Sequence, residues 1–272
     1  MTYLQAFLQY EQQLVRPEEL RYVFRYARQL SYTDLIMLLN TEISEEDQTF
    51  LNMIFQRLLQ DEPAQYIVGQ TEFCGLTLDV DTRALIPRPE TEELVALVLA
   101  ENEGGYPLRV LDIGTGTGSI ALSLAQARPD WQLLATDISA DALALAKQNA
   151  DKLGIRTVAF AQSDVFSQVS GKYELIVSNP PYIADFEKAE MAANVLDYEP
   201  HLALFAAEDG LAIYQKISDE LTSVLKPNGK VYLEIGHLQG VAVSQIFQQV
   251  VPQKRVRILQ DLSGKDRMIA ID

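Results

Sequence analysis

The spacing of apolar residues divides the chain into two regions with different patterns. Over residues 1 to about 70, apolar side chains recur every three to four positions, which is typical of amphipathic helices. Pro17, Ser31 with Thr33, and Ser44 each stand where such a helix is expected to begin. We therefore expect a small helical bundle here, with helices over 3–14, 17–30, a short stretch after 31, and 45–59.

Beyond residue 70, short apolar runs alternate with helical patterns. A strand or hairpin is expected over Thr71–Val80, and Pro87-Arg88-Pro89 breaks the pattern before a helix over Thr91–Ala100. The order that follows predicts an α/β domain with a mostly parallel sheet, closed by a hairpin turning at Ser263-Gly264 that makes one strand antiparallel. The expected strands cover 109–113, 132–136, 156–162, 175–178 and 230–235, and the expected helices cover 119–125, 140–152, 211–225 and 238–250. These patterns give a domain division of 1–70, 71–90 as hairpin and linker, and 91–272.

One tetrapeptide, Asn179-Pro180-Pro181-Tyr182, carries the strongest chemical signal. It follows the apolar run 175–178, and each proline lacks an N–H and holds the preceding residue extended. The tetrapeptide therefore presents a carboxamide and backbone carbonyls as acceptors for a planar N–H group, with Tyr182 as a flat packing face. The alternative is a strand-ending turn whose tyrosine packs into the core.

A glycine-rich turn precedes this tetrapeptide by about sixty residues. Gly114-Thr115-Gly116-Thr117-Gly118 follows the strand 109–113 and opens a helix, so the backbone can approach a ligand closely at a helix N-terminus. The spacing is G-x-G-x-G, and Ser119 stands where the dinucleotide fingerprint G-x-G-x-x-G continues, so that fingerprint is not met.

Two acids end the next two expected strands. Asp137 lies about twenty residues beyond the glycines, at a position where a carboxylate accepts hydrogen bonds from ribose hydroxyls. The alternative is that it only places a negative charge at the N-terminus of the helix capped by Ser139. Asp164 could reach an adenine amine or cap a loop. The carboxyl ends of parallel strands bring Gly114, Asp137, Asp164 and Asn179 to one edge, where we expect a nucleoside ligand.

Composition narrows the class of protein. The chain has 272 residues, 22 basic against 38 acidic, and a net charge of −16, which argues against affinity based on phosphate neutralisation. The single cysteine and two distant histidines give no disulfide and no metal cluster. The absence of a long apolar run and of a basic leader leads us to expect a cytoplasmic protein.

The order of glycine turn, two strand-ending acids and N-P-P-Y resembles the class I S-adenosylmethionine-dependent methyltransferases. Three further groups of segments resemble release factor glutamine methyltransferases of the HemK/PrmC type: Glu62–Gly69, Phe73–Leu78 with Leu85–Glu92, and Tyr198-Glu199-Pro200 with Asp209-Gly210-Leu211. The resemblance implies a doubly wound seven-stranded sheet and methyl transfer to the glutamine amide nitrogen in the Gly-Gly-Gln motif of peptide chain release factors. We also expect a monomer that acts on protein. The helical region has capped helices, is separated by the Pro87-Arg88-Pro89 linker and has no chemical motif, so we expect it to recognise the substrate.

Site roles follow from the residues and the resemblance together. S-adenosylmethionine is expected against Gly114, Thr115, Gly116, Thr117, Gly118, Asp137, Asp164, Val165 and Asn179. Asn179, Pro180, Pro181 and Tyr182 are expected to bind the acceptor amide and to position it for the reaction, without a metal. Some members of the family have tryptophan at the position of Val165, which leaves the adenine packing open.

Alternative substrates remain at this point. A sister enzyme with the same tetrapeptide would methylate glutamine in a ribosomal protein, and related enzymes methylate amines of nucleic-acid bases. A base methylator needs a basic groove, which the composition does not favour. A non-catalytic interaction protein of the same fold would have a broken glycine turn or a broken acceptor motif.

Overall fold

The chain folds into two compact units. The computed structural model describes residues 1–272 apart from the side chain of Glu190. One unit consists of residues 1–71 with 192–198, and the other of residues 72–191 with 199–272. Each unit is described separately below.

The first unit is helical, and two of its helices begin at serine caps. Ser31 and Ser44 accept hydrogen bonds from Asp34 N and Asp47 N, so both act as N-caps, whereas Thr33 lies inside its helix. Phe7, Phe24 and Leu51 are fully buried between the helices. The helices are α1 (Tyr3–Glu11), α2 (Glu18–Ala27), α3 (Tyr32–Leu38), α4 (Glu45–Leu58), α5 (Ala64–Val68) and the later α9 (Ala193–Tyr198).

The segment after the first unit forms the expected hairpin. Strands β1 (Gln70–Phe73) and β2 (Leu76–Asp79) pair across Cys74 and Gly75, whose φ angles of 49° and 76° are both left-handed. Phe73, Leu76 and Leu78 belong to the apolar core of the second unit. The hairpin is therefore part of that unit's core.

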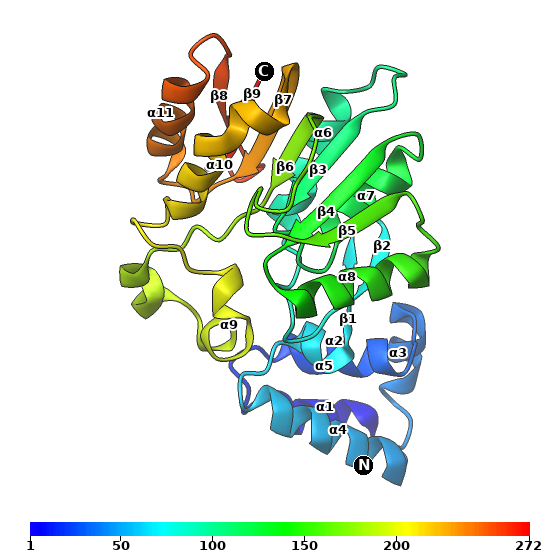
Figure 1. Cartoon of the computed structure of the whole chain (residues 1–272). Helices are drawn as coiled ribbons and strands as arrows, with labels where there is room; N and C mark the ends of the chain where they lie inside the picture. The colour runs from blue at the N-terminus through cyan, green and yellow to red at the C-terminus, as the bar shows by residue number, and fades with distance from the viewer. The chain divides into compact units, whose positions relative to one another are not determined.

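The second unit is built on a seven-stranded sheet with the order β5-β4-β3-β6-β7-β9-β8 (Figure 1). All neighbouring pairs from β5 to β7 are parallel, and β9 runs antiparallel to both of its neighbours. This confirms the predicted mostly parallel seven-stranded sheet with one antiparallel strand. The strands are β3 (Arg109–Ile113), β4 (Gln132–Asp137), β5 (Val158–Gln162), β6 (Tyr173–Ser178), β7 (Leu225–Glu234), β8 (Val256–Gln260) and β9 (Asp266–Ile271).

Helices cover both faces of this sheet. Consecutive residues of β3 belong to different apolar clusters: Val110 packs with α6 and α7, and Leu111 with α10 and α11. This alternation is the side-chain period of a strand that is buried on both faces, and it makes the sheet doubly wound. The helices are α6 (Pro89–Ala100), α7 (Ser119–Ala127), α8 (Ala140–Leu153), α10 (Ala212–Val224) and α11 (Gly240–Val250).

One strand differs from its prediction. Pro227-Asn228-Gly229, expected as a turn before a strand at Lys230, lies inside β7, which begins at Leu225. The pairing with β6 shifts from Tyr173–Leu225 to Leu175–Lys230. Between these two pairs β7 advances by five residues and β6 by only two. The turn residues are therefore accommodated as an irregularity within a longer strand.

The long segment after the tetrapeptide contains only short helices. They are η1 (Asp185–Glu190), α9, and η2 (His201–Ala203), and Ile183 forms an isolated bridge with Phe205. Within the described part of the chain, the helices lack the length and apolar character needed to cross a membrane.

Candidate functional site

A cavity of about 270 Å³ opens in the second unit at the carboxyl ends of β3, β4, β5 and β6. This is where an open α/β sheet binds its ligands. The sequence-predicted residues in its lining are Gly114, Thr115, Gly116, Thr117, Asp137, Asp164, Val165, Asn179, Pro180 and Pro181. The structure thus brings the two predicted clusters, glycine turn and acceptor tetrapeptide, to one cavity.

The glycine turn needs its glycines for two different reasons. Gly114 and Gly116 have φ angles of +71° and +56°, and a Cβ atom at either position would meet nothing closer than 3.9 Å, so backbone conformation is what favours glycine there. At Gly118, the N-cap of α7, a Cβ would lie 3.0 Å from Leu122 and 3.3 Å from Ala146. Gly118 therefore serves helix packing.

Asp112 lies directly beneath this turn and was missed from the sequence. Its side chain is fully buried, and its Oδ2 accepts from Thr115 Oγ1 at 2.6 Å. Burial raises the pKa of Asp112 to about 7. An acid inside an otherwise apolar strand is the signal that could have marked it.

Asp137 connects the turn to the start of α8. Its Oδ2 accepts from Gly116 N and its Oδ1 from Ser139 N, both at 2.9 Å. Burial raises the pKa of this carboxyl, and the backbone hydrogen bonds oppose the rise. Each carboxylate oxygen keeps a second lone pair, so Asp137 can hold the turn and also accept from hydroxyls of a ligand.

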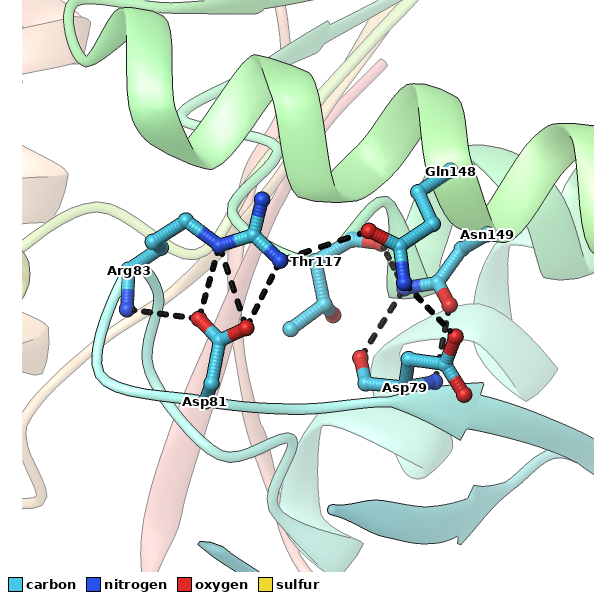
Figure 2. A network of polar contacts seen from close by, with 6 residues as sticks. All are labelled: Asp79, Asp81, Arg83, Thr117, Gln148 and Asn149. Carbon is cyan, nitrogen blue, oxygen red and sulfur yellow. Dashed lines mark hydrogen bonds and ion pairs between the residues drawn. The ribbon is translucent and has the colours of Figure 1, made fainter.

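A buried asparagine ties the hairpin to the glycine turn (Figure 2). Asn149 of α8 accepts from Asp79 N at 2.7 Å, and its Nδ2 donates to the carbonyls of Asp79 (3.1 Å) and Thr117 (3.0 Å). Asn149 is fully buried. One carboxamide therefore fixes the end of β2 and the Thr117 carbonyl at the cavity, a contact between residues far apart in sequence.

The loop after β5 holds an unusual backbone conformation. Val165 is β-branched yet has a φ of 51°, and Ser163 Oγ donates to its carbonyl at 2.9 Å. Left-handed β-branched residues are strained and cluster at functional sites. The neighbouring Asp164 forms an ion pair with Lys216 at 2.9 Å, and both line the cavity.

The tetrapeptide follows directly from β6. Ser178 Oγ donates to Ile113 O at 2.7 Å, which aligns the ends of β6 and β3. Asn179 Nδ2 then donates to Thr91 Oγ1 at 3.0 Å. Tyr182 packs on the apolar cluster of α10 and α11, with its hydroxyl 3.5 Å from Glu234 Oε1. Burial and the nearby Glu234 raise the pKa of Tyr182 to about 12.

Glu234, at the end of β7, is a second acid missed from the sequence. It is 2% exposed, and its Oε2 accepts from Thr91 Oγ1 at 2.6 Å. Its place at the end of an apolar parallel strand is the same signal that marked Asp137.

The linker before α6 and the long segment after the tetrapeptide are joined beside the cavity. Glu199 is 3% exposed and accepts from Arg88 Nη2 at 2.5 Å and from Ile86 N at 3.1 Å. Pro87, Arg88, Pro200 and Leu202 all line the cavity. The ion pair between Arg88 and the buried Glu199 therefore joins residues 86–88 and 199–202 into one wall.

This arrangement suits a nucleoside with a polar extension. The Asp137 carboxylate can accept from ribose hydroxyls, and Ile138, Ala142 and Val165 offer apolar surface to a base. Gly114 and Gly116 leave the backbone open to close approach. The residues present therefore fit S-adenosylmethionine.

Comparisons with known proteins agree with this geometry. Residues 73–200 match the family model described as Methyltransferase small domain, and residues 3–69 match the PrmC N-terminal domain. The release factor glutamine methyltransferase of Streptococcus pneumoniae is 50% identical over 100% of this chain and 99% of its own length. The protein of the same name from Lactococcus lactis is 49% identical over 100% of both chains.

Solved structures support the fold. The hMettl16 catalytic domain aligns with a TM-score of 0.60 at 17% identity, covering 79% of this chain and 83% of its own. A methyltransferase from Pyrococcus furiosus aligns with a TM-score of 0.54 at 17% identity, covering 72% of this chain and 88% of its own. The chain has the class I methyltransferase fold with a cavity that fits the cofactor, and two relatives are 50% and 49% identical over its whole length. It therefore belongs to the family of release factor glutamine methyltransferases.

Proposed function

We propose that this protein transfers the methyl group of S-adenosylmethionine to the side-chain amide nitrogen of the glutamine in the Gly-Gly-Gln motif of peptide chain release factors. The observation that carries the proposal is the shared cavity of Asp137 and Asn179-Pro180. A carboxylate suited to ribose hydroxyls and a set of N–H acceptors line one cavity. The relatives at 50% and 49% identity supply the substrate class through their names.

When bound, S-adenosylmethionine supplies an electrophilic methyl group on a positively charged sulfur. Residues Gly114–Thr117 and Asp137 would hold this cofactor. The Asn179 side-chain oxygen and the Pro180 carbonyl would accept the two N–H groups of the glutamine amide and aim its nitrogen. Because an amide nitrogen is a weak nucleophile whose lone pair is delocalised, orientation carries most of the rate enhancement.

The first unit would recognise the release factor, and the second would perform the chemistry. Support comes from the separate compact core of residues 1–71 with 192–198 and from the match of residues 3–69 to the PrmC N-terminal domain. The net charge of −16 favours a protein substrate over nucleic acid. We further propose that the enzyme acts as a monomer in the cytoplasm.

The direct test is mass spectrometry of a purified release factor incubated with the enzyme and S-adenosylmethionine. We expect one added methyl group on the Gly-Gly-Gln glutamine and none on a release factor with glutamate at that position. A parallel arm offers purified ribosomal proteins and total RNA. Methylation of a ribosomal protein or of RNA, with the release factor unmodified, would contradict the proposal.

A further inference from the structure

Three side chains from three parts of the second unit form a hydrogen-bond chain behind the tetrapeptide. Asn179 Nδ2 donates to Thr91 Oγ1 at 3.0 Å, and Thr91 Oγ1 donates to Glu234 Oε2 at 2.6 Å. Thr91 is 3% and Glu234 2% exposed; Asn179 and Thr91 line the cavity, and Glu234 lies outside its lining. The chain thus runs from a buried acid to the proposed acceptor site.

The direction of this chain follows from the number of protons available. An ionised carboxylate can only accept, and a threonine hydroxyl has a single proton to donate. Since that proton goes to Glu234, Thr91 Oγ1 can only accept from Asn179. The NH₂ end of the carboxamide is therefore held at Thr91, and its oxygen lies at the opposite end of the planar group.

We propose that Thr91 and Glu234 are positioning residues that hold the Asn179 carboxamide with its oxygen toward the acceptor, so that the site selects an N–H donor. This inference rests on the proposed function, because it concerns the same acceptor amide. A reversed carboxamide would present NH₂ to the substrate. The site would then favour a carboxylate, such as glutamate, over the glutamine amide.

The ionisation state of Glu234 decides whether this direction is fixed. Burial raises the pKa of Glu234 to about 7, nearby Glu90 adds to the rise, and the Thr91 hydrogen bond, Arg267 and the Tyr182 hydrogen bond oppose it. Tyr214 donates to the Glu234 backbone carbonyl at 2.8 Å. Below about pH 7 the carboxyl is protonated and can itself donate to Thr91, which frees the threonine proton for Asn179 and removes the fixed direction.

The primary test replaces Thr91→Val, which keeps the shape and removes the hydroxyl. We expect kcat on the release factor to fall about 10- to 100-fold, the range for losing an outer partner that orients a ligating side chain, with cofactor affinity unchanged. Thr91→Ser should retain most of the activity. The matched control is Thr77→Val, because Thr77 donates to Glu72 at 2.8 Å in an exposed contact of the β1–β2 hairpin, outside the cavity lining.

A second measurement reads the carboxamide direction itself. Binding of a release factor with glutamine at the target is compared with binding of one with glutamate. Wild type and Thr77→Val should prefer glutamine, and Thr91→Val should lose about tenfold or more of that preference. An unchanged kcat and an unchanged preference in Thr91→Val would overturn the proposal, as would equal losses in Thr77→Val.

Two further readouts separate the hydrogen-bond chain from a merely structural role. At saturating cofactor, wild-type kcat should rise with pH through about 7, and Glu234→Gln should lack this rise; the same rise in Glu234→Gln would contradict the inference. Independently of turnover, the side-chain NH₂ signal of Asn179 in NMR, assigned by its loss in Asn179→Ala, should shift and exchange faster with solvent in Thr91→Val. If the wild-type enzyme methylates no release factor, the proposed function is wrong. If the Asn179 NMR signal is the same in Thr91→Val as in wild type, only the hydrogen-bond chain is contradicted.

Discussion

Gly210 lies directly against the carbonyl oxygen of Tyr182. A Cβ atom built on Gly210 would come 2.0 Å from that oxygen, and its φ of +82° independently favours glycine. Gln239 Nε2 donates to the same carbonyl at 2.9 Å. The last residue of the acceptor tetrapeptide is thus fixed by close packing on one side and by a hydrogen bond on the other.

Replacing Gly210→Ala should therefore displace the tetrapeptide. We expect kcat on the release factor to fall by about tenfold or more, because misplacing a positioning group by roughly 1 Å can cost about 10²-fold. Steady-state kinetics measure this, with Gly264→Ala as the control, since that glycine also has a positive φ of +77° but nothing within 4 Å of its Cβ position. Equal effects of both substitutions would show that backbone strain alone is responsible.

Asp137→Ala should weaken cofactor binding. Loss of hydrogen bonds to a charged group costs about 1.5–3 kcal/mol, and the variant also leaves Gly116 N and Ser139 N without their acceptor. Titration calorimetry with S-adenosylmethionine measures the change. Asp164→Ala, which removes an exposed ion pair with Lys216, tests the second predicted acid, and we expect a smaller loss there. If Asp137→Ala binds S-adenosylmethionine with unchanged affinity, Asp137 does not contact the cofactor.

Asn179→Ala should act on the acceptor more than on the cofactor. We expect turnover to fall by about 10² or more, the scale for losing an aligned polar contact in the transition state, while cofactor affinity stays within a few-fold of wild type. Single-turnover kinetics and calorimetry separate the two effects. A variant that binds no cofactor, or that methylates normally, would show that the role is misassigned.

Asn149→Leu should destabilise the second unit and loosen the glycine turn. The substitution removes the Asn149 hydrogen bonds to Asp79 N and to the carbonyls of Asp79 and Thr117, and each buried group left unsatisfied costs about 1–3 kcal/mol. Urea unfolding measures the loss, and Gln148→Leu is the control, because Gln148 contacts Asp79 and Arg83 from the exposed side of α8 (Figure 2). If the urea midpoint of Asn149→Leu shifts no more than that of Gln148→Leu, the structural role assigned to Asn149 is wrong.

Removal of residues 1–69, which form most of the first unit, should reduce substrate preference and spare cofactor binding. The fragment must begin near Gln70, because Phe73, Leu76 and Leu78 belong to the core of the second unit. We expect the ratio of kcat/KM for intact release factor to kcat/KM for a loop peptide to fall, since remote contacts improve turnover on large substrates. An unchanged ratio in a fragment that is folded by circular dichroism would make the first unit a structural appendage.

Local signals account for what could be predicted from the sequence. The start of α8 at Ala140 follows from the Ser139 cap, and the glycine turn and N-P-P-Y follow strands whose apolar runs are visible. The start of β7 could not be predicted, because Pro227-Asn228-Gly229 has the composition of a turn and only pairing with β6 keeps it in the strand. Thr91 and Glu234 are 143 positions apart, so no local pattern indicates their contact.

The strand order has a consequence for synthesis on the ribosome. β9 lies between β7 and β8 yet follows both in the chain, so its two neighbours emerge first with their facing edges unpaired. Unpaired strand edges readily bind other strands. The gap can be filled only when residues 266–271 have left the exit tunnel, so closure of the sheet waits for its last strand. Nascent chains stalled before that point should therefore be the forms of this protein that most need a chaperone.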